Sequence, residues 1–372
     1  DLKALNFMRK DSLSVFKGVV DMKMKGTSLD NVVGSINFNK TYYKNINDEY
    51  FFDDFAINSS FKDDVRYLEV NSPDIIKGQM SGVFLIDDID ELFYNALGSL
   101  YTNYTPYKVQ TNQYIDFNFK IYNKIVEVFV PDLKLGKNTF IQGRVESDEK
   151  EFKLTFKSPR IALFEYFANN IELQVDNKNP LFNTYVEVDS IATKYYNISK
   201  FNLINVTLND TLFMRSEIKG GTNNDDLYNL SFYHTKTVDN QSVIGFKKSD
   251  VTFKENKWYI NEKRDKFNKV TFDNDFKNFS FDQFVLNHNN EEIKLSGLLK
   301  GNNNKDLKLN FKDVNLDKIT PEVEGLTLQG LVNGDIDLLQ QNGSYLPVSE
   351  IIIDDLEEAG DGALRRAFEL LK

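Results

Sequence analysis

The chain has 372 residues, a net charge of −11 and no cysteine. The absence of cysteine excludes disulfides, thiolate catalysis and zinc–thiolate sites. The negative charge argues against binding to nucleic acid or to an anionic membrane surface, because both partners attract basic proteins. What remains is a strong pattern of alternating apolar and polar residues, which runs from about Leu13 to Ile353.

The first hundred residues read as β-strands followed by a helix. Stretches such as "KGVVDMKMKG" and "VRYLEVNS" place apolar side chains on one face of a strand. The period then changes over residues 88–98, where Leu92, Phe93, Ala96 and Leu97 follow helical spacing. We assign residues 1–100 to an N-terminal β segment that ends in an amphipathic helix lying against the sheet.

Residues 101–355 continue the alternation without a linker or a break in composition. Turns rich in Asn, Asp and Gly, such as "GGTNNDD" and "KGNNNKD", separate the apolar runs and favour hairpins. We therefore predict a continuous β segment in which successive strands are neighbours in space. Within it, Ser158–Asn170 fits either a second short helix capped by Ser158 or a strand that carries a bulge.

Residues 356–372 differ from the rest of the chain in composition. Arg365 and Arg366 are adjacent and flanked by Ala and Leu, whereas the body of the chain carries its positive charge mainly as Lys. We predict a helical tail, with the helix itself over about residues 361–372, and we leave open whether it is natural or engineered.

The sequence shows no catalytic or metal-binding constellation. His234 and His288 have no further histidine with which to complete a ligand set. Adjacent carboxylates such as Asp53 and Asp54 point to opposite faces of a strand, so the two cannot act on one substrate. We therefore expect a non-enzymatic protein with neither cofactor nor metal. Trp258 and the adjacent Tyr259 are candidates for stacking on a sugar ring, but packing within the sheet is the favoured interpretation of strand aromatics.

The apolar strand face is the strongest candidate for a functional surface. A β-sandwich buries such a face with about 100–200 residues per core, and this alternation runs much further. We predict a mainly β fold, a long antiparallel meander rolled into an open, taco-like groove with an apolar interior and one or two short amphipathic helices. Such a groove suits acyl chains, because each methylene removed from water gains about 0.8 kcal/mol.

Alternation assigns one set of side chains to the lining of this groove. The expected lining residues are Phe117, Phe119, Ile121, Val126, Val128, Val130, Leu154, Phe156, Leu173, Val175, Val186, Val188, Leu230, Phe232, Val251, Phe253, Leu307, Leu309 and Phe311. A one-residue bulge would turn the assigned side chains of a strand to the opposite face.

Over about residues 1–355 the chain resembles the TamB family of Bacteroidetes-type bacteria. The resemblance rests on stretches such as "NDTLFMRSEIKGG", "VIGFKKSDVTFKENKWYIN", "FVLNHNNEEIKLSGLLKG" and "DLKLNFKDVNLDKITPEVEGLTLQGLVNGDIDLL". The upstream stretch "FKGVVDMKMKGTSLDNVVGSINF" is similar in style and order. TamB is an AsmA-like envelope family, which in turn resembles the bridge-like lipid transfer proteins.

The resemblance implies a protein of the periplasm and cell envelope that carries phospholipid between the inner and outer membranes. It also implies an N-terminal inner-membrane anchor, which we expect to lie outside this chain, and a partnership with an Omp85-type outer-membrane barrel (TamA-like) in outer-membrane assembly. We therefore expect a non-enzymatic lipid conduit. Two alternatives stay open: a carbohydrate- or protein-binding β module of a surface protein, and a chaperone for outer-membrane protein insertion.

Overall fold

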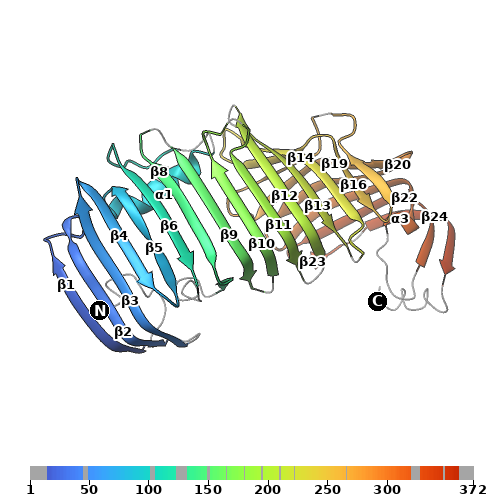
Figure 1. Ribbon diagram of the computed structural model, residues 1–372. Coiled ribbons are helices and arrows are strands. Elements are labelled where there is room, and N and C mark those ends of the chain that lie inside the picture. The colour runs from blue at the N-terminus through green and yellow to red at the C-terminus, as the bar shows by residue number, and fades with distance from the viewer. Residues whose placement is uncertain are drawn as a thin grey trace. The chain divides into compact units, whose positions relative to one another are not determined.

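The computed structural model describes residues 15–44, 49–100, 105–122, 132–148, 151–164, 166–179, 181–193, 196–208, 211–221, 223–264, 266–319, 327–346 and 348–359. Within these residues the fold is mainly β, and the strands follow one another as an antiparallel meander (Figure 1). This confirms the predicted fold class. Backbone contacts group the chain into two units, Asp1–Val206 and Thr207–Lys372, which are described in turn.

The N-terminal unit is built almost entirely from strands. They are β1 (Val15–Lys25), β2 (Val33–Lys44), β3 (Glu49–Lys62), β4 (Val65–Ser72), β5 (Ile76–Val83), β6 (Tyr114–Ile121), β7 (Leu133–Leu135), β8 (Thr139–Glu146), β9 (Phe152–Leu163), β10 (Tyr166–Asp176), β11 (Thr184–Ala192) and β12 (Asn197–Leu208). β5 pairs with β6 along its whole length, so the sheet continues past residue 100. The short β7 and the longer β8 both pair with β9.

Helix α1 (Ile89–Gly98) covers part of one face of this sheet, and it lies where the sequence predicted a helix over residues 88–98. It follows the 3-10 helix η2 (Ile86–Asp88), while a second 3-10 helix, η1 (Leu29–Asn31), connects β1 to β2. Leu92 is 1% exposed and packs with Ile115 and Val145 in the core between helix and sheet. Full burial of one leucine contributes about 1.5–3 kcal/mol, so the apolar side of α1 fixes the helix to the sheet.

Residues 158–163 and 166–170 form strands rather than a helix. β9 and β10 pair as a hairpin in which Ser158 is opposite Ile171. Pro159 has no N–H group to donate, and β9 pairs with β8 up to Lys157 and with β7 from Ile161 onward. The proline therefore lies in the gap between the two partner strands, where its missing donor costs nothing. The segment therefore forms strands rather than a helix, and its pairing within the hairpin keeps one register, without the predicted bulge.

The C-terminal unit is also an antiparallel meander. Its elements are β13 (Thr211–Gly220), β14 (Asp226–Lys236), β15 (Ser242–Phe246), β16 (Ser249–Phe253), β17 (Asn256–Ile260), β18 (Lys269–Phe272), β19 (Asn278–His288), β20 (Glu291–Lys300), β21 (Asn304–Asn315), helix α3 (Leu316–Ile319), β22 (Thr327–Gln341), β23 (Ser344–Tyr345) and β24 (Val348–Ala359). The long β14 pairs with both β15 and β16, and β19 pairs with both β17 and β18. None of the helices in the described ranges is long and apolar enough to span a bilayer.

The start of the predicted helical tail is a strand. β24 extends to Ala359, and Glu357 and Glu358 lie opposite Gln329 and Leu328 of β22. Pairing with the edge of an existing sheet outweighs the local helix propensity of this segment. The sheet therefore extends four residues past the predicted boundary at residue 355, and the predicted helix over about residues 361–372 lies outside the described residues.

Candidate functional site

The strand register of the N-terminal unit aligns apolar residues in one row across the sheet. Each member lies directly opposite the next one on the neighbouring strand, so all their side chains share a face. From β1 to β12 this N-terminal apolar row consists of Met22, Ile36, Ile57, Val70, Gly78, Phe119, Ile141, Phe156, Leu173, Val186 and Leu203. No member of the row has a polar side chain.

The N-terminal apolar row is covered only in part. Phe119, Ile141, Phe156 and Leu173 all keep some exposure, and Met22 is 61% exposed. Helix α1 covers one end of this face, and the buried residues of the core cluster lie between the helix and the sheet there. In a closed sandwich a second sheet would bury the whole row. An apolar surface therefore remains accessible in the part of the unit that the structure describes.

A similar row crosses the C-terminal unit. This C-terminal apolar row consists of Leu212, His234, Ile244, Val270, Phe281, Gly297, Leu307 and Leu338. Burial lowers the pKa of His234, and the positive charge of Lys236 lowers it further. Both effects favour the uncharged imidazole at neutral pH, so the row carries no charge there.

Each predicted lining residue that the structure describes lies on the apolar face of its unit. In the N-terminal unit these are Phe117, Phe119, Ile121, Leu154, Phe156, Leu173, Val175, Val186 and Val188. In the C-terminal unit they are Leu230, Phe232, Val251, Phe253, Leu307, Leu309 and Phe311. Phe117, Ile121, Val175 and Val188 are buried, and the others are partly exposed. Val126, Val128 and Val130 lie outside the described residues.

Several members of the rows were not predicted. Ile36, Ile57 and Val70 lie in strands that the alternation does indicate, but only the pairing register shows that they continue the row from β6 toward β1. Arg66, which is 2% exposed on the same face, has no sequence signal at all. Its burial depends on the connection between β1 and β2, which is distant from Arg66 in the sequence.

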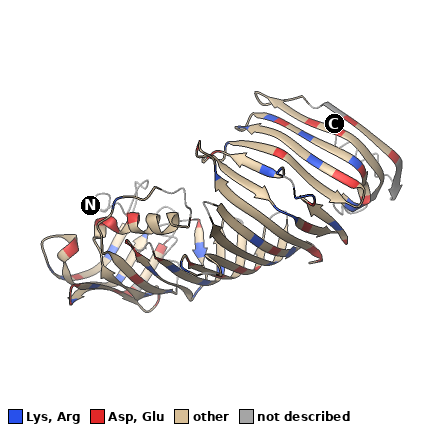
Figure 2. Ribbon diagram, turned by 90° about the horizontal axis from the view of Figure 1, so that it is seen from above, with Lys and Arg blue, Asp and Glu red and all other residues tan. Residues whose placement is uncertain are grey.

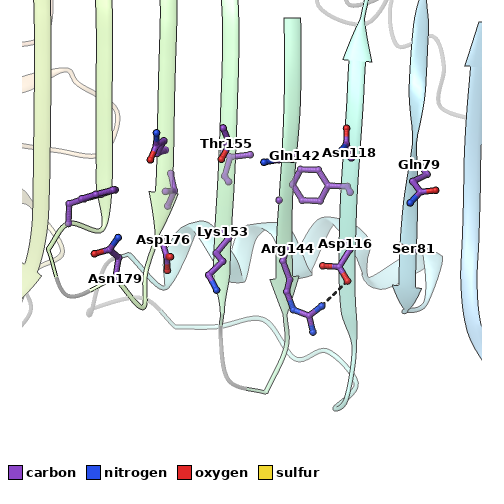
Figure 3. A pocket seen from close by; sticks show the side chains of 16 residues that line it. Gln79, Ser81, Asp116, Asn118, Gln142, Arg144, Lys153, Thr155, Asp176 and Asn179 are labelled. Carbon is purple, nitrogen blue, oxygen red and sulfur yellow. Dashed lines mark hydrogen bonds and ion pairs between the residues drawn. The ribbon is translucent and has the colours of Figure 1, made fainter.

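The opposite face of the N-terminal sheet is polar and hollowed. Gln79, Asn118, Gln142 and Thr155 lie opposite one another on successive strands (Figure 3). They line a hollow of about 550 Å³ together with Arg144, whose Nη1 donates a hydrogen bond to Asp116 Oδ2 at 2.7 Å. The two faces of the sheet thus differ in chemistry as strict alternation predicts.

Ion pairs and hydrogen bonds connect the side chains of this polar face. Lys157 Nζ lies 2.9 Å from Glu172 Oε1, and its hydrogen bond is the main reason that the pKa of Glu172 is lowered. The hydroxyl of Tyr185 donates to Glu187 Oε2 at 2.6 Å, which raises the pKa of Tyr185 to about 12. Figure 2 shows Lys, Arg, Asp and Glu interspersed along the strands. Ion pairs at a sheet surface of this kind contribute about 0–1 kcal/mol each to stability.

Trp258 is buried, at 3% exposure, and its ring centroid lies 5.3 Å from that of His288. This agrees with packing, the favoured interpretation of a strand aromatic, and not with sugar stacking by Trp258, because the strand frame turns it to the apolar face beside Val251. His288 Nδ1 lies 2.8 Å from the carbonyl oxygen of Lys257, so this ring nitrogen is already engaged in a hydrogen bond. Among the described residues no group of three or more His, Asp or Glu side chains could hold a metal ion.

The comparisons with known proteins leave the family open. The chain matches no protein-family model, no curated protein and no solved structure. The resemblance to TamB therefore stays a prediction from the sequence.

Proposed function

We propose that this chain is a non-enzymatic conduit for lipid acyl chains. The observation that carries the proposal is the N-terminal apolar row, which crosses the sheet from β1 to β12 without a polar side chain. Strands in a sheet lie about 4.8 Å apart, so an acyl chain that follows the row passes from one apolar side chain to the next. At about 0.8 kcal/mol per methylene, a chain of about sixteen carbons gains on the order of 10 kcal/mol.

The partial exposure of the row supports this proposal. A core residue contributes to stability only when it is buried, whereas a binding surface has to remain open to its ligand. Phe156 and Leu173 lie in the middle of the row and are still partly exposed. Contiguous exposed apolar surface of this kind is typical of sites that bind proteins, membranes or ligands.

The cellular setting is proposed from the resemblance to the TamB family. On that basis the cargo is phospholipid, the location is the periplasm, and the transport connects the inner and outer membranes. The partners would be an Omp85-type barrel (TamA-like) and the inner membrane. A chaperone for outer-membrane protein insertion would use the same sheet and stays the alternative. A carbohydrate- or protein-binding module stays a second alternative. Of its two candidate aromatic residues, Trp258 is buried and Tyr259 is partly exposed.

Bound lipid in the purified protein tests the proposal. We expect native mass spectrometry and lipid extraction of the full chain to show phospholipid. Leu173→Asp places a charge on the row and should lower the amount of bound lipid at least about tenfold. A carboxylate that a bound acyl chain removes from water costs several kcal/mol. Gln174→Asp changes the neighbouring position on the polar face and should leave lipid binding intact. A chain that carries no lipid and takes none up from vesicles would refute the conduit.

A further inference from the structure

A buried arginine lies on the apolar face of the N-terminal unit. Arg66 of β4 is directly opposite Phe61 of β3 and Gly82 of β5, and it shares its strand face with Leu68 and Val70. The side chain is 2% exposed. Arginine is almost never buried to this extent unless its charge is paired.

The hydrogen bonds of Arg66 use only part of its guanidinium. Nη2 donates to the carbonyl oxygen of Leu29 at 2.8 Å and contacts Ser59 Oγ at 3.4 Å. Within the described ranges, Nε and Nη1 have no hydrogen-bond partner. Burial lowers the pKa of Arg66, and the charge of Asp30 only partly opposes this effect. The guanidinium also lies over the Phe61 ring, with Cζ 5.5 Å from the ring centroid. Two of its N–H donor atoms therefore remain for an anion, although its charge already interacts with Phe61 and Asp30.

We propose that Arg66 binds the phosphate of a lipid headgroup whose acyl chains lie on the N-terminal apolar row. This inference rests on the proposed function. Arg66 is four residues from Val70, a member of the row, so along an extended strand the two are about 13 Å apart. Arginine pairs with phosphate through several charge-assisted hydrogen bonds at once. Gly82, opposite Arg66, leaves no room for the phosphate on its own side, because a Cβ atom built there would lie 1.9 Å from the backbone oxygen of Tyr114; the headgroup therefore has to approach from the side of η1.

The element that contacts the guanidinium is small and exposed. η1 reaches Arg66 through the carbonyl group of Leu29, whose own side chain is 66% exposed. Asp30 Oδ1 accepts a hydrogen bond from the backbone N–H of Ile86 at 2.8 Å, which connects η1 to η2. A phosphate replaces the neutral Leu29 carbonyl as the acceptor for Nη2, and a bond between two charged groups is the stronger one. Binding of a headgroup is therefore expected to displace η1.

The test compares two lipids with the same acyl chains. The full chain is incubated with vesicles that contain either phosphatidylglycerol or the corresponding diacylglycerol, and the lipid that it takes up is measured. We expect wild-type protein to prefer phosphatidylglycerol at least about tenfold, the effect of one charge-assisted hydrogen bond or more. Arg66→Gln should lose this preference and still take up diacylglycerol. Arg215→Gln, which changes an arginine side chain that is 73% exposed, should keep it.

Each other outcome decides against the inference. A folded Arg66→Gln variant that keeps the preference would show that Arg66 only holds η1. If Arg66→Gln does not fold, Arg66→Lys keeps the charge without the planar fork, and an undiminished preference in that variant would also overturn the proposal. Titration with inorganic phosphate separates the sources, because Arg66-dependent binding as tight as that of the lipid would assign the site to free phosphate. Uptake of neither lipid would refute the conduit as well, whereas uptake of both without preference refutes only the headgroup site.

Discussion

Phe117 of β6 fills the space beside Gly143 of β8. The two residues lie directly opposite each other, and a Cβ atom built on Gly143 would lie 2.6 Å from Cζ of Phe117. Phe93 of α1 packs against the same ring, with the two ring centroids 5.5 Å apart. The missing side chain at Gly143 thus lets one aromatic residue connect the sheet to its covering helix.

A side chain at Gly143 should destabilise the N-terminal unit. Its Cβ would also lie 2.2 Å from the backbone oxygen of Lys153, so Gly143→Val forces both the ring and the strand to move. We expect the free energy of unfolding in urea to fall by about 1–3 kcal/mol. Gln142→Val, one position along β8 on the open polar face, should change it by less than about 0.5 kcal/mol. Equal effects of the two substitutions would contradict the packing described.

Charge on the apolar face should have different consequences at two neighbouring positions. Val188 is 5% exposed, whereas Val186 is partly exposed on the N-terminal apolar row. Val188→Asp buries a carboxylate and should cost several kcal/mol of stability. Water reaches a charge at Val186, so Val186→Asp should fold with a loss of about 1 kcal/mol and bind much less lipid. If urea denaturation shows equally large losses, the face is an ordinary core.

The alternation of single strands was enough to predict the two faces of the sheet. Phe117 and Phe119 could be assigned to the apolar face because the side-chain period of a strand is two, and no bulge interrupts β6. Helix α1 was also predictable, because Leu92 and Ala96 follow helical spacing within a segment that lacks alternation.

What the sequence did not show depends on contacts between distant segments. Arg66 is buried because the carbonyl group of Leu29 reaches it from the connection between β1 and β2. Trp258 is buried because its strand frame turns it inward beside Val251, and the frame of a five-residue strand is weakly specified by its own sequence. Glu357 lies in a strand because β22 offers it an edge. Local propensity carries no information about such partners.

Glu291 should depend on Lys318 for its burial. The carboxylate is 6% exposed and accepts hydrogen bonds from Lys318 Nζ at 3.0 Å and from Asn315 Nδ2 at 2.8 Å. Lys318→Met leaves the buried carboxylate without its cation and should lower the free energy of unfolding by about 1–3 kcal/mol. The double variant Glu291→Gln/Lys318→Met should recover part of that loss, since the uncharged amide needs no cation. A simple sum of the two single losses would show that the pair is not coupled.

Tyr185 should titrate well above the ordinary tyrosine pKa of about 10. Its hydrogen bond to Glu187 stabilises the protonated phenol and raises the pKa to about 12. A pKa raised in the folded state contributes stability that is present below pH 10 and is lost as the pH rises from about 10 to 12. Glu187→Gln should move the titration of Tyr185 back toward the ordinary value. Ultraviolet difference titration, with Tyr185→Phe to assign the signal, would contradict this prediction if Tyr185 titrated near pH 10 in the wild-type chain.

Site-specific photo-crosslinking tests the central claim most directly. Ile141 and Gln142 are neighbours on β8, but Ile141 belongs to the N-terminal apolar row and Gln142 to the polar face. A photoreactive amino acid is placed at each position in turn, and the full chain is irradiated in cells or with phospholipid vesicles. The conduit predicts phospholipid adducts at position 141 and none at position 142. Adducts at both positions, or at neither, would contradict a lipid pathway along the apolar face.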